Sequence, residues 1–252
     1  MRAAPPNLTR DPLPADLTGK HVAIAGGRRS SDELFFMRFA PMLKARGADL
    51  SYRGDPDLTS LMGRGGVFDD PREPDFTVSS GDLPFVIEAD AAAGTLRATP
   101  ITSLPERRND ARDMLQSTGP GLYIRVTWRA GPDHPPLDGV AAALASVAGD
   151  VILLQADPSQ DEIDRFEAAL GRNVTDLAPP DGDIEALLAL MGLLDEYVCV
   201  DNINMHLRAA RGRGGLRGAG NPGARTPQTV SARLLVCRPV QLQLDHGKNG
   251  VQ

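Results

Sequence analysis

The chain of 252 residues contains little cysteine and no long apolar run. Its two cysteines, Cys199 and Cys237, are too few for a disulfide framework or a zinc site, so a reducing compartment is expected. No segment is apolar over the length that a membrane span requires, and the Pro-rich opening at residues 1–6 is not a signal peptide. These absences predict a cytoplasmic protein without a membrane span.

The remaining composition is that of a globular protein, with 41% hydrophobic and 24% charged residues. This length is enough for one large or two modest domains. The net charge of −6 is unevenly spread: from Arg208 onwards, seven Arg and one Lys face a single Asp, a balance of +7 that leaves −13 for residues 1–207. The acidic body would repel phosphate chains, and no aromatic residue is interleaved with the Arg residues of the tail. Nucleic-acid binding is therefore disfavoured.

Strand-like apolar runs alternate with helical segments in two successive series, which predicts an α/β protein with parallel sheets and two Rossmann-like lobes. The expected divisions are a leader at 1–18, an N-terminal lobe at 19–116, a C-terminal lobe at 117–210 and a basic Gly/Arg-rich tail at 211–252. The expected strands span 20–27, 48–52, 75–78, 122–128, 150–155, 173–177 and 197–200, and the expected helices span 32–46, 57–62, 107–116, 137–147, 160–170, 183–194 and 202–210.

A polar cluster follows the strand at 197–200, and it consists of Asp201, Asn202, Asn204 and His206. In open α/β sheets, ligands bind outside the carboxyl ends of strands, where N–H groups at the next helix N-terminus are free. The first three side chains therefore lie where a phosphate or sugar would bind, and His206 shares a helix face with Asn202. The alternative is equally compatible with the spacing: a helix cap at Asp201 or Asn202 and a packed His206.

Three other strand ends carry candidate ligand-binding residues. Arg129 could grip a phosphate with its planar guanidinium or be a solvated loop residue, and Gln155 could touch a ligand or cap its loop. Asp32 follows the glycine turn at 26–27 and could be a helix cap or a general base that faces the cleft. That turn has neither a P-loop nor a dinucleotide fingerprint.

Together, these segments resemble the heptosyltransferase-like glycosyltransferases of GT-B fold, especially the branch found behind tetratricopeptide repeats. The resemblance covers about residues 20–210. The most specific segments are Tyr-Ile-Arg-Val-Thr-Trp-Arg-Ala-Gly at 123–131 and Asp-Glu-Tyr-Val with Asn-Met-His-Leu within 195–207. Further matching segments are 32–41, 81–84 and 104–107.

The resemblance implies metal-independent transfer of a sugar from a nucleotide-activated donor to an unknown glycan or protein acceptor, with no cofactor. The donor would be held mainly by the second lobe, and Asp32 would be the general base that deprotonates the acceptor hydroxyl. Arg129, Asp201, Asn202 and His206 would line the donor diphosphate and sugar. A cation and helix N–H groups can stabilise the charge that grows on the diphosphate.

Three departures from the family pattern support an alternative, a catalytically inactive remnant that binds a nucleotide or a partner. Ser30-Ser31 replaces the glycine pair before the catalytic position, and no tetratricopeptide repeats precede the domain in this sequence. After Leu207 the family pattern stops, and a Gly/Arg-rich segment follows. The hypothesis for this tail is a degenerate or frame-shifted version of the family's ending. It is expected to be the least ordered part, because it offers little apolar surface.

Overall fold

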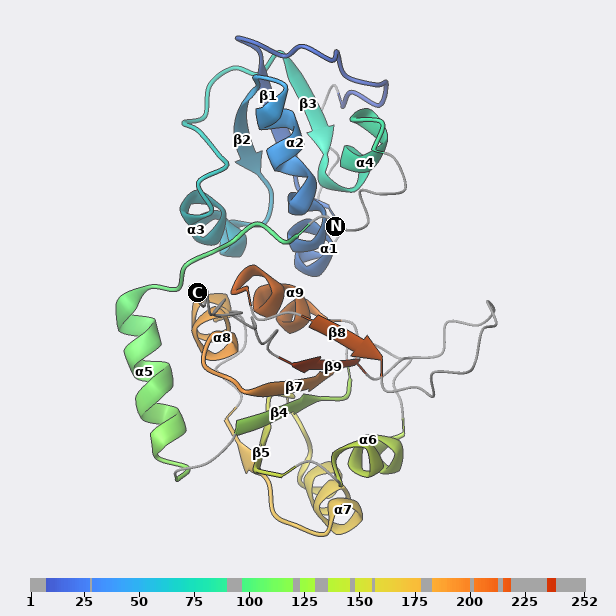
Figure 1. Cartoon of the computed structure of the whole chain (residues 1–252), viewed down its shortest axis with the longest axis vertical. Helices are drawn as coiled ribbons and strands as arrows, with labels where there is room; N and C mark the ends of the chain where they lie inside the picture. The colour runs from blue at the N-terminus through green and yellow to red at the C-terminus, as the bar shows by residue number, and fades with distance from the viewer. Residues whose placement is uncertain are drawn as a thin grey trace, which may run out of the picture.

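The protein consists of two α/β lobes stacked along its long axis, as the computed structural model shows (Figure 1). The first lobe contains a three-stranded parallel sheet, and the second contains a sheet of six strands, four of them parallel. The predicted fold class, α/β with two Rossmann-like lobes, is confirmed. The structure describes residues 8–27, 29–89, 97–119, 123–129, 136–145, 148–155, 157–177, 183–199, 202–212, 215–218 and 235–238.

The first sheet has the strand order β2-β1-β3. Its central strand is buried along its whole length, because the run His-Val-Ala-Ile-Ala has strands on both sides and helices against it. The strands are β1 (His21–Ala25), β2 (Asp49–Arg53) and β3 (Phe76–Ser79). The helices of this lobe are α1 (Ser30–Phe36), η1 (Met37–Phe39), α2 (Ala40–Ala45), α3 (Pro56–Arg64), η2 (Ser80–Asp82) and α4 (Leu83–Val86).

The single helix predicted for 32–46 is wrong, because the structure divides this segment into α1, η1 and α2. Pro41 lies in the first turn of α2, where it has no N–H to donate to the carbonyl of Met37 and its ring would clash with that carbonyl. Instead, the Met37 carbonyl accepts hydrogen bonds from the backbone N–H of Ala40 and, at 3.2 Å, from the Thr99 hydroxyl. The segment therefore forms two short α-helices joined by a 3-10 turn, and not one continuous helix.

The second sheet has the strand order β6-β5-β4-β7-β9-β8. Its parallel strands are β4 (Tyr123–Thr127), β5 (Asp150–Leu153), β6 (Thr175–Asp176) and β7 (Glu196–Cys199). Two strands at its edge come from the tail and are antiparallel, β9 (Leu235–Arg238) against β7 and β8 (Gly215–Gly218) against β9. The composition of the tail did not predict these strands. The helices are α5 (Pro105–Gln116), α6 (Leu137–Leu144), α7 (Gln160–Leu170), α8 (Ile184–Met191) and α9 (Ile203–Ala210).

Helices cover both faces of the second sheet. The α6 and α7 face has a compact core in which Trp128 stacks on Phe166, with ring centroids 5.2 Å apart. On the other face, apolar residues of α8 and α9 continue into the core of the first lobe as one buried cluster. Because this cluster includes residues of both lobes, the lobes are packed against each other.

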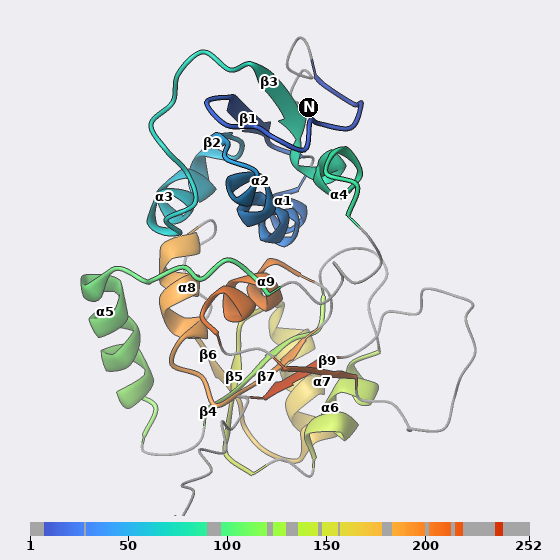
Figure 2. The same cartoon turned by 45° about the horizontal axis from the view of Figure 1, so that its top comes forward.

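The lobes are also joined by the extended segment at 97–104, which runs over α8 and α9 to α5 (Figure 2). Ile101 donates its N–H to the Ala210 carbonyl at 3.0 Å and accepts from the Arg211 guanidinium at 2.9 Å. Arg64 of α3 donates to the Thr102 carbonyl and forms a 2.5 Å ion pair with Glu185 of α8. These contacts hold α3, in the first lobe, against the second. No helix within the described ranges combines the length and apolarity that crossing a membrane would require.

Candidate functional site

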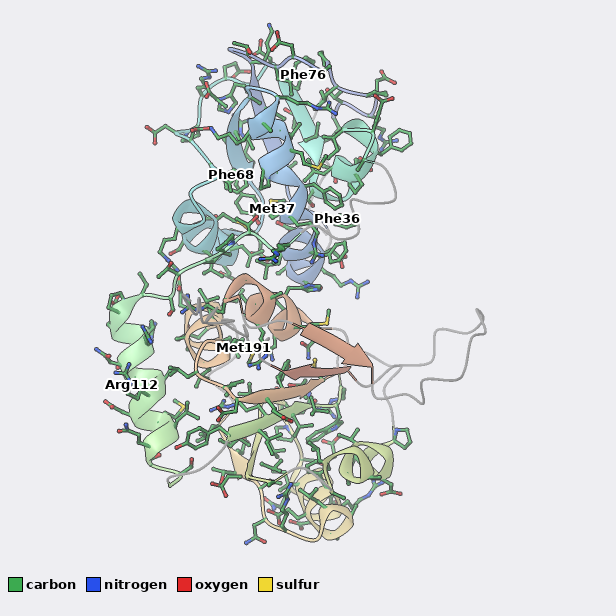
Figure 3. The ribbon with its side chains drawn as sticks, viewed as in Figure 1. Phe36, Met37, Phe68, Phe76, Arg112 and Met191 are labelled. Carbon is green, nitrogen blue, oxygen red and sulfur yellow. The ribbon has the colours of Figure 1, made fainter. Side chains whose placement is uncertain are left out.

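A hollow of about 240 Å³ lies where α1 of the first lobe meets α9 of the second. Phe36, the last residue of α1, lies above the junction of the two lobes, whereas Met191 lies on α8 below it (Figure 3). The hollow is lined by Arg29, Ser31, Asp32, Phe35 and Phe36 from one lobe and Met205 and His206 from the other. The structure therefore brings two of the expected site residues, Asp32 and His206, to one space.

Asp32 belongs to the first turn of α1 and is not the residue that precedes the helix, so it does not fill the N-cap position. Its side chain is 43% exposed, and its carboxylate lies 3.4 Å from Nε of Arg29, which is itself 76% exposed. Exposed ion pairs of this kind contribute at most about 1 kcal/mol. The carboxylate is therefore readily accessible to a molecule in the hollow.

His206 is a buried residue of α9 that contacts the first lobe. Its ring packs edge-to-face on Phe35, with centroids 5.6 Å apart and an interplanar angle of 70°. Packing, the alternative interpretation of His206, therefore accounts for the contact with Phe35, but His206 also lines the hollow. His206 combines an apolar contact with a position beside Asp32.

Asn202 is the N-cap of α9, as the alternative interpretation proposed. Its Oδ1 accepts from the Met205 N–H at 3.2 Å, and its side chain hydrogen-bonds the Tyr197 hydroxyl. That hydroxyl also donates to Oγ1 of Thr127 at 3.0 Å, and burial raises the pKa of Tyr197. Asn204 is buried beside this cluster, and its Oδ1 finds no hydrogen-bond partner among the described residues. Asp201 lies outside the described residues.

Arg129 and Gln155 lie together after the carboxyl ends of β4 and β5, and neither is among the residues that line the hollow. The Gln155 side chain accepts from the N–H groups of Trp128 and Arg129 and donates to the Arg129 carbonyl, so it braces this strand end. The Arg129 guanidinium pairs with Glu162 at 2.6 Å and donates to the Asp157 carbonyl at 3.1 Å. A backbone hydrogen bond from Ser159, together with the charge of Arg129, lowers the pKa of Glu162.

Glu33, next to Asp32, was missed by the sequence analysis. It is 2% exposed, and its carboxylate accepts hydrogen bonds from the Tyr52 hydroxyl and, at 3.1 Å, from the Asp55 N–H. Burial, followed by the hydrogen bond and charge of Glu33, raises the pKa of Tyr52. One signal was available in the sequence: Glu33 precedes the buried Met37 by four residues and so lies on the core-facing side of the helix.

Within the described ranges, no group of three or more His, Cys, Asp or Glu side chains is arranged to hold a metal ion. The candidate site thus combines an accessible carboxylate with the exposed guanidinium of Arg29, the Ser31 residue, an imidazole from α9 and an apolar wall.

Two Rossmann-like lobes that meet across such a hollow define a GT-B-like architecture. No family model and no curated protein matches the chain. Among solved structures, it is similar to a glycosyl transferase of family 9 from Veillonella parvula, with 12% identity, a TM-score of 0.62 and coverage of 80% of this chain and 81% of the other. It is also similar to the ADP-heptose lipopolysaccharide heptosyltransferase II of E. coli, with 13% identity, a TM-score of 0.54 and coverage of 77% and 83%.

A third similar structure is the dodecameric iron-containing glycosyltransferase TibC of enterotoxigenic E. coli, with 12% identity and a TM-score of 0.52. That match covers 78% of this chain and 57% of TibC. At these identities the likeness establishes the fold. The chain therefore has structural similarity to family 9 heptosyltransferases of GT-B fold.

Proposed function

We propose that this protein is a glycosyltransferase that moves a sugar from a nucleotide-activated donor to an acceptor hydroxyl, with Asp32 as the general base. The main support is the convergence of Asp32 from one lobe and His206 from the other on a single hollow. The names of the similar structures, a family 9 glycosyl transferase and an ADP-heptose heptosyltransferase, support the same reaction class.

In the proposed reaction, the Asp32 carboxylate takes the proton of the acceptor hydroxyl as that oxygen attacks the anomeric carbon of the donor sugar. The new C–O bond forms as the bond between the anomeric carbon and the diphosphate oxygen breaks, and the bonding electrons leave with the nucleoside diphosphate. A general base of this kind contributes roughly 10²- to 10⁴-fold to the rate. The apolar wall of Phe35, Phe36 and Met205 would limit the access of competing water.

The donor would lie at the carboxyl edge of the second sheet, near the N-terminus of α9. The helix dipole and the first-turn N–H groups other than that of Met205, which Asn202 caps, favour the negative charge that develops on the diphosphate. Asp201, Asn204 and His206 are the proposed contacts of the sugar and diphosphate. Asn202 would act mainly through its cap of α9, and Gln155 through its brace of the strand end at Arg129.

Arg129 is the proposed cation for the diphosphate, although its guanidinium is now paired with Glu162. A planar guanidinium has five N–H donors, so it can keep one carboxylate contact and still bind a phosphate oxygen. The pair is about one-third exposed on the Arg129 side, so a ligand can reach it.

The test is a titration with uridine, adenosine and guanosine diphosphate sugars, with calorimetry for binding and chromatography for donor hydrolysis and transfer. The proposal expects one donor class to bind and to release its nucleoside diphosphate. If no donor is consumed over a range of acceptors, including water, the enzyme assignment is contradicted.

The alternative is an inactive GT-B-like module that binds a nucleotide or a partner. One observation favours it: Arg129 is already paired with Glu162, and Asn202 already accepts a hydrogen bond from the α9 backbone, so neither side chain is fully available to a donor. Tight nucleotide binding without any turnover in the same titration would support this alternative.

A further inference from the structure

We infer that Glu33 is a positioning residue that holds Asp32 toward the hollow. This inference rests on the proposed function, because the direction of Asp32 affects a rate only if Asp32 is the base. Glu33 is the neighbour of Asp32 in the first turn of α1, yet its side chain is directed into the protein instead of the hollow. It is 2% exposed, whereas the Asp32 side chain is 43% exposed.

The buried carboxylate of Glu33 is part of a closed set of hydrogen bonds. It accepts from the Tyr52 hydroxyl and from the Asp55 N–H, and that same N–H also lies 2.8 Å from the Tyr52 oxygen. Burying a carboxylate is costly unless it is hydrogen-bonded, and bonds to a charged acceptor are the stronger kind. These contacts therefore fix the Glu33 carboxylate against the segment that follows β2.

Two glycines make the space for this carboxylate. A Cβ placed on Gly26 would lie 2.7 Å from both carboxylate oxygens of Glu33, and a Cβ on Gly54 would overlap Oε2 of Glu33 and the Tyr52 hydroxyl. The glycine turn after β1 is thus filled by the protein's own carboxylate. This explains why glycine occurs at 26 although the turn matches no phosphate-binding motif.

The first turn of α1 is anchored at a second point, where the Ser30 hydroxyl donates to Oδ2 of Asp55. Asp55 is itself the N-cap of α3, because its Oδ1 accepts from the Asp57 N–H at 3.2 Å. Ser30 and Glu33 therefore bind the same residue from either side of Asp32. The starts of α1 and α3 are held together by this shared contact.

The geometry of the helix links the direction of Asp32 to the fixed position of Glu33. Consecutive residues on an α-helix point about 100° apart, so a Glu33 fixed toward the core leaves Asp32 directed to the hollow. Without the Glu33 contacts, the first turn would be held only through Ser30, since α1 has no side-chain N-cap, and Asp32 would lose its fixed direction. A base displaced by about 1 Å can lose roughly 10²-fold in rate.

The test compares kcat and the donor KM of the wild-type chain with those of Glu33 variants. Glu33→Ala is expected to lower kcat about 10²-fold with the donor KM unchanged, because the donor is held by the second lobe. Glu33→Gln is expected to recover most of the rate, since its amide can accept from Asp55 and pair with Tyr52. Glu33→Asp keeps the charge but shortens the reach, so an intermediate kcat is expected and provides a measurement if the alanine variant does not fold.

Gly54→Ala perturbs the same carboxylate from the opposite side and is expected to lower kcat as Glu33→Ala does. Its matched control is Gly63→Ala, because a Cβ at Gly63 of α3 meets no atom within 4 Å, and the wild-type rate is expected there. Wild-type kcat in every Glu33 variant that folds, or equal losses of kcat and donor affinity, would overturn the inference and leave the proposed function standing. A wild-type chain that consumes no donor would instead remove the proposed function, and this inference with it.

Discussion

Acidification below pH 6.5 is expected to destabilise the first lobe through His21. The imidazole is buried at the start of β1, where one ring nitrogen, Nε2, lies 2.8 Å from the Ser51 hydroxyl. The other, Nδ1, accepts a 3.0 Å hydrogen bond from Nε of Arg72. A nitrogen that accepts from a guanidinium cannot carry a proton, so the neutral ring is the form that this structure binds. Burial, followed by the charge of Arg72, lowers the pKa of His21.

The sign of the pH dependence follows from the lowered pKa of His21. The unfolded chain takes up a proton near pH 6.5, whereas the folded chain does so only at lower pH. His21 therefore contributes stability that is fully present above about pH 6.5 and is lost as the pH falls through its folded pKa. Between the two pKa values, the free energy of unfolding falls by at most about 1.4 kcal/mol for each pH unit.

The assay is urea denaturation of the wild-type chain and of a His21→Gln variant from pH 5 to pH 8. Glutamine does not titrate but can still hydrogen-bond Ser51, so the variant should lose the slope assigned to His21. Two carboxylates that face this region, Asp69 and Asp75, are expected to titrate at lower pH in both chains, because hydrogen bonds lower their pKa values. Identical slopes in the two chains between pH 5 and 6.5 would show that His21 is not the source of this pH dependence.

Three further predictions concern the donor cation, the core and the lobe contact. Arg129→Ala should raise the donor KM, because it removes the cation proposed for the diphosphate. The control Arg112→Ala, on the exposed side of α5, should leave the donor KM unchanged. Equal donor KM values in the two variants would exclude Arg129 from the donor site. Phe166→Ala should lower the free energy of unfolding by about 3–5 kcal/mol, because it removes a fully buried ring stacked on Trp128. Phe85→Ala, at a side chain that is 70% exposed, should change that free energy little, and similar losses in both variants would contradict the packing account. A double-mutant cycle on Arg64 and Glu185 should give a coupling of about 1 kcal/mol, and a coupling of zero would mean that the pair does not hold the lobes together.

Much of the fold could be predicted because its strands are continuous apolar runs and its helices carry one apolar face. The run at Val151–Leu153 and the amphipathic helix that ends at Gly171 are examples, since both follow from local periodicity. The division at Pro41 was also visible in principle, because proline removes a helical N–H, but the apolar spacing continues across it. The strands β8 and β9 depend on pairing with β7, a non-local contact that the Gly/Arg-rich composition does not reveal.

The candidate site could be predicted only where the place of a residue at a strand end determines where it lies in the fold. Strand ends in a parallel sheet share one edge, and Arg129 and Gln155, two candidates from strand ends, lie together there. The pairing of Arg129 with Glu162, 33 residues away, depends on how α7 packs, so local spacing could not reveal it. For the same reason the buried role of Glu33 was missed, because its partners Tyr52 and Asp55 belong to the next βα unit.

The most direct test of the account is turnover by an Asp32→Asn variant, with Asp110→Asn on the exposed face of α5 as the matched control. Asparagine keeps the shape of the side chain but cannot take the acceptor's proton. The Asp32 variant is expected to bind the nucleotide sugar with wild-type affinity and to lose roughly 10²- to 10⁴-fold in kcat, while the control keeps the wild-type rate. Transfer at the wild-type rate by the Asp32 variant would show that Asp32 is not the general base.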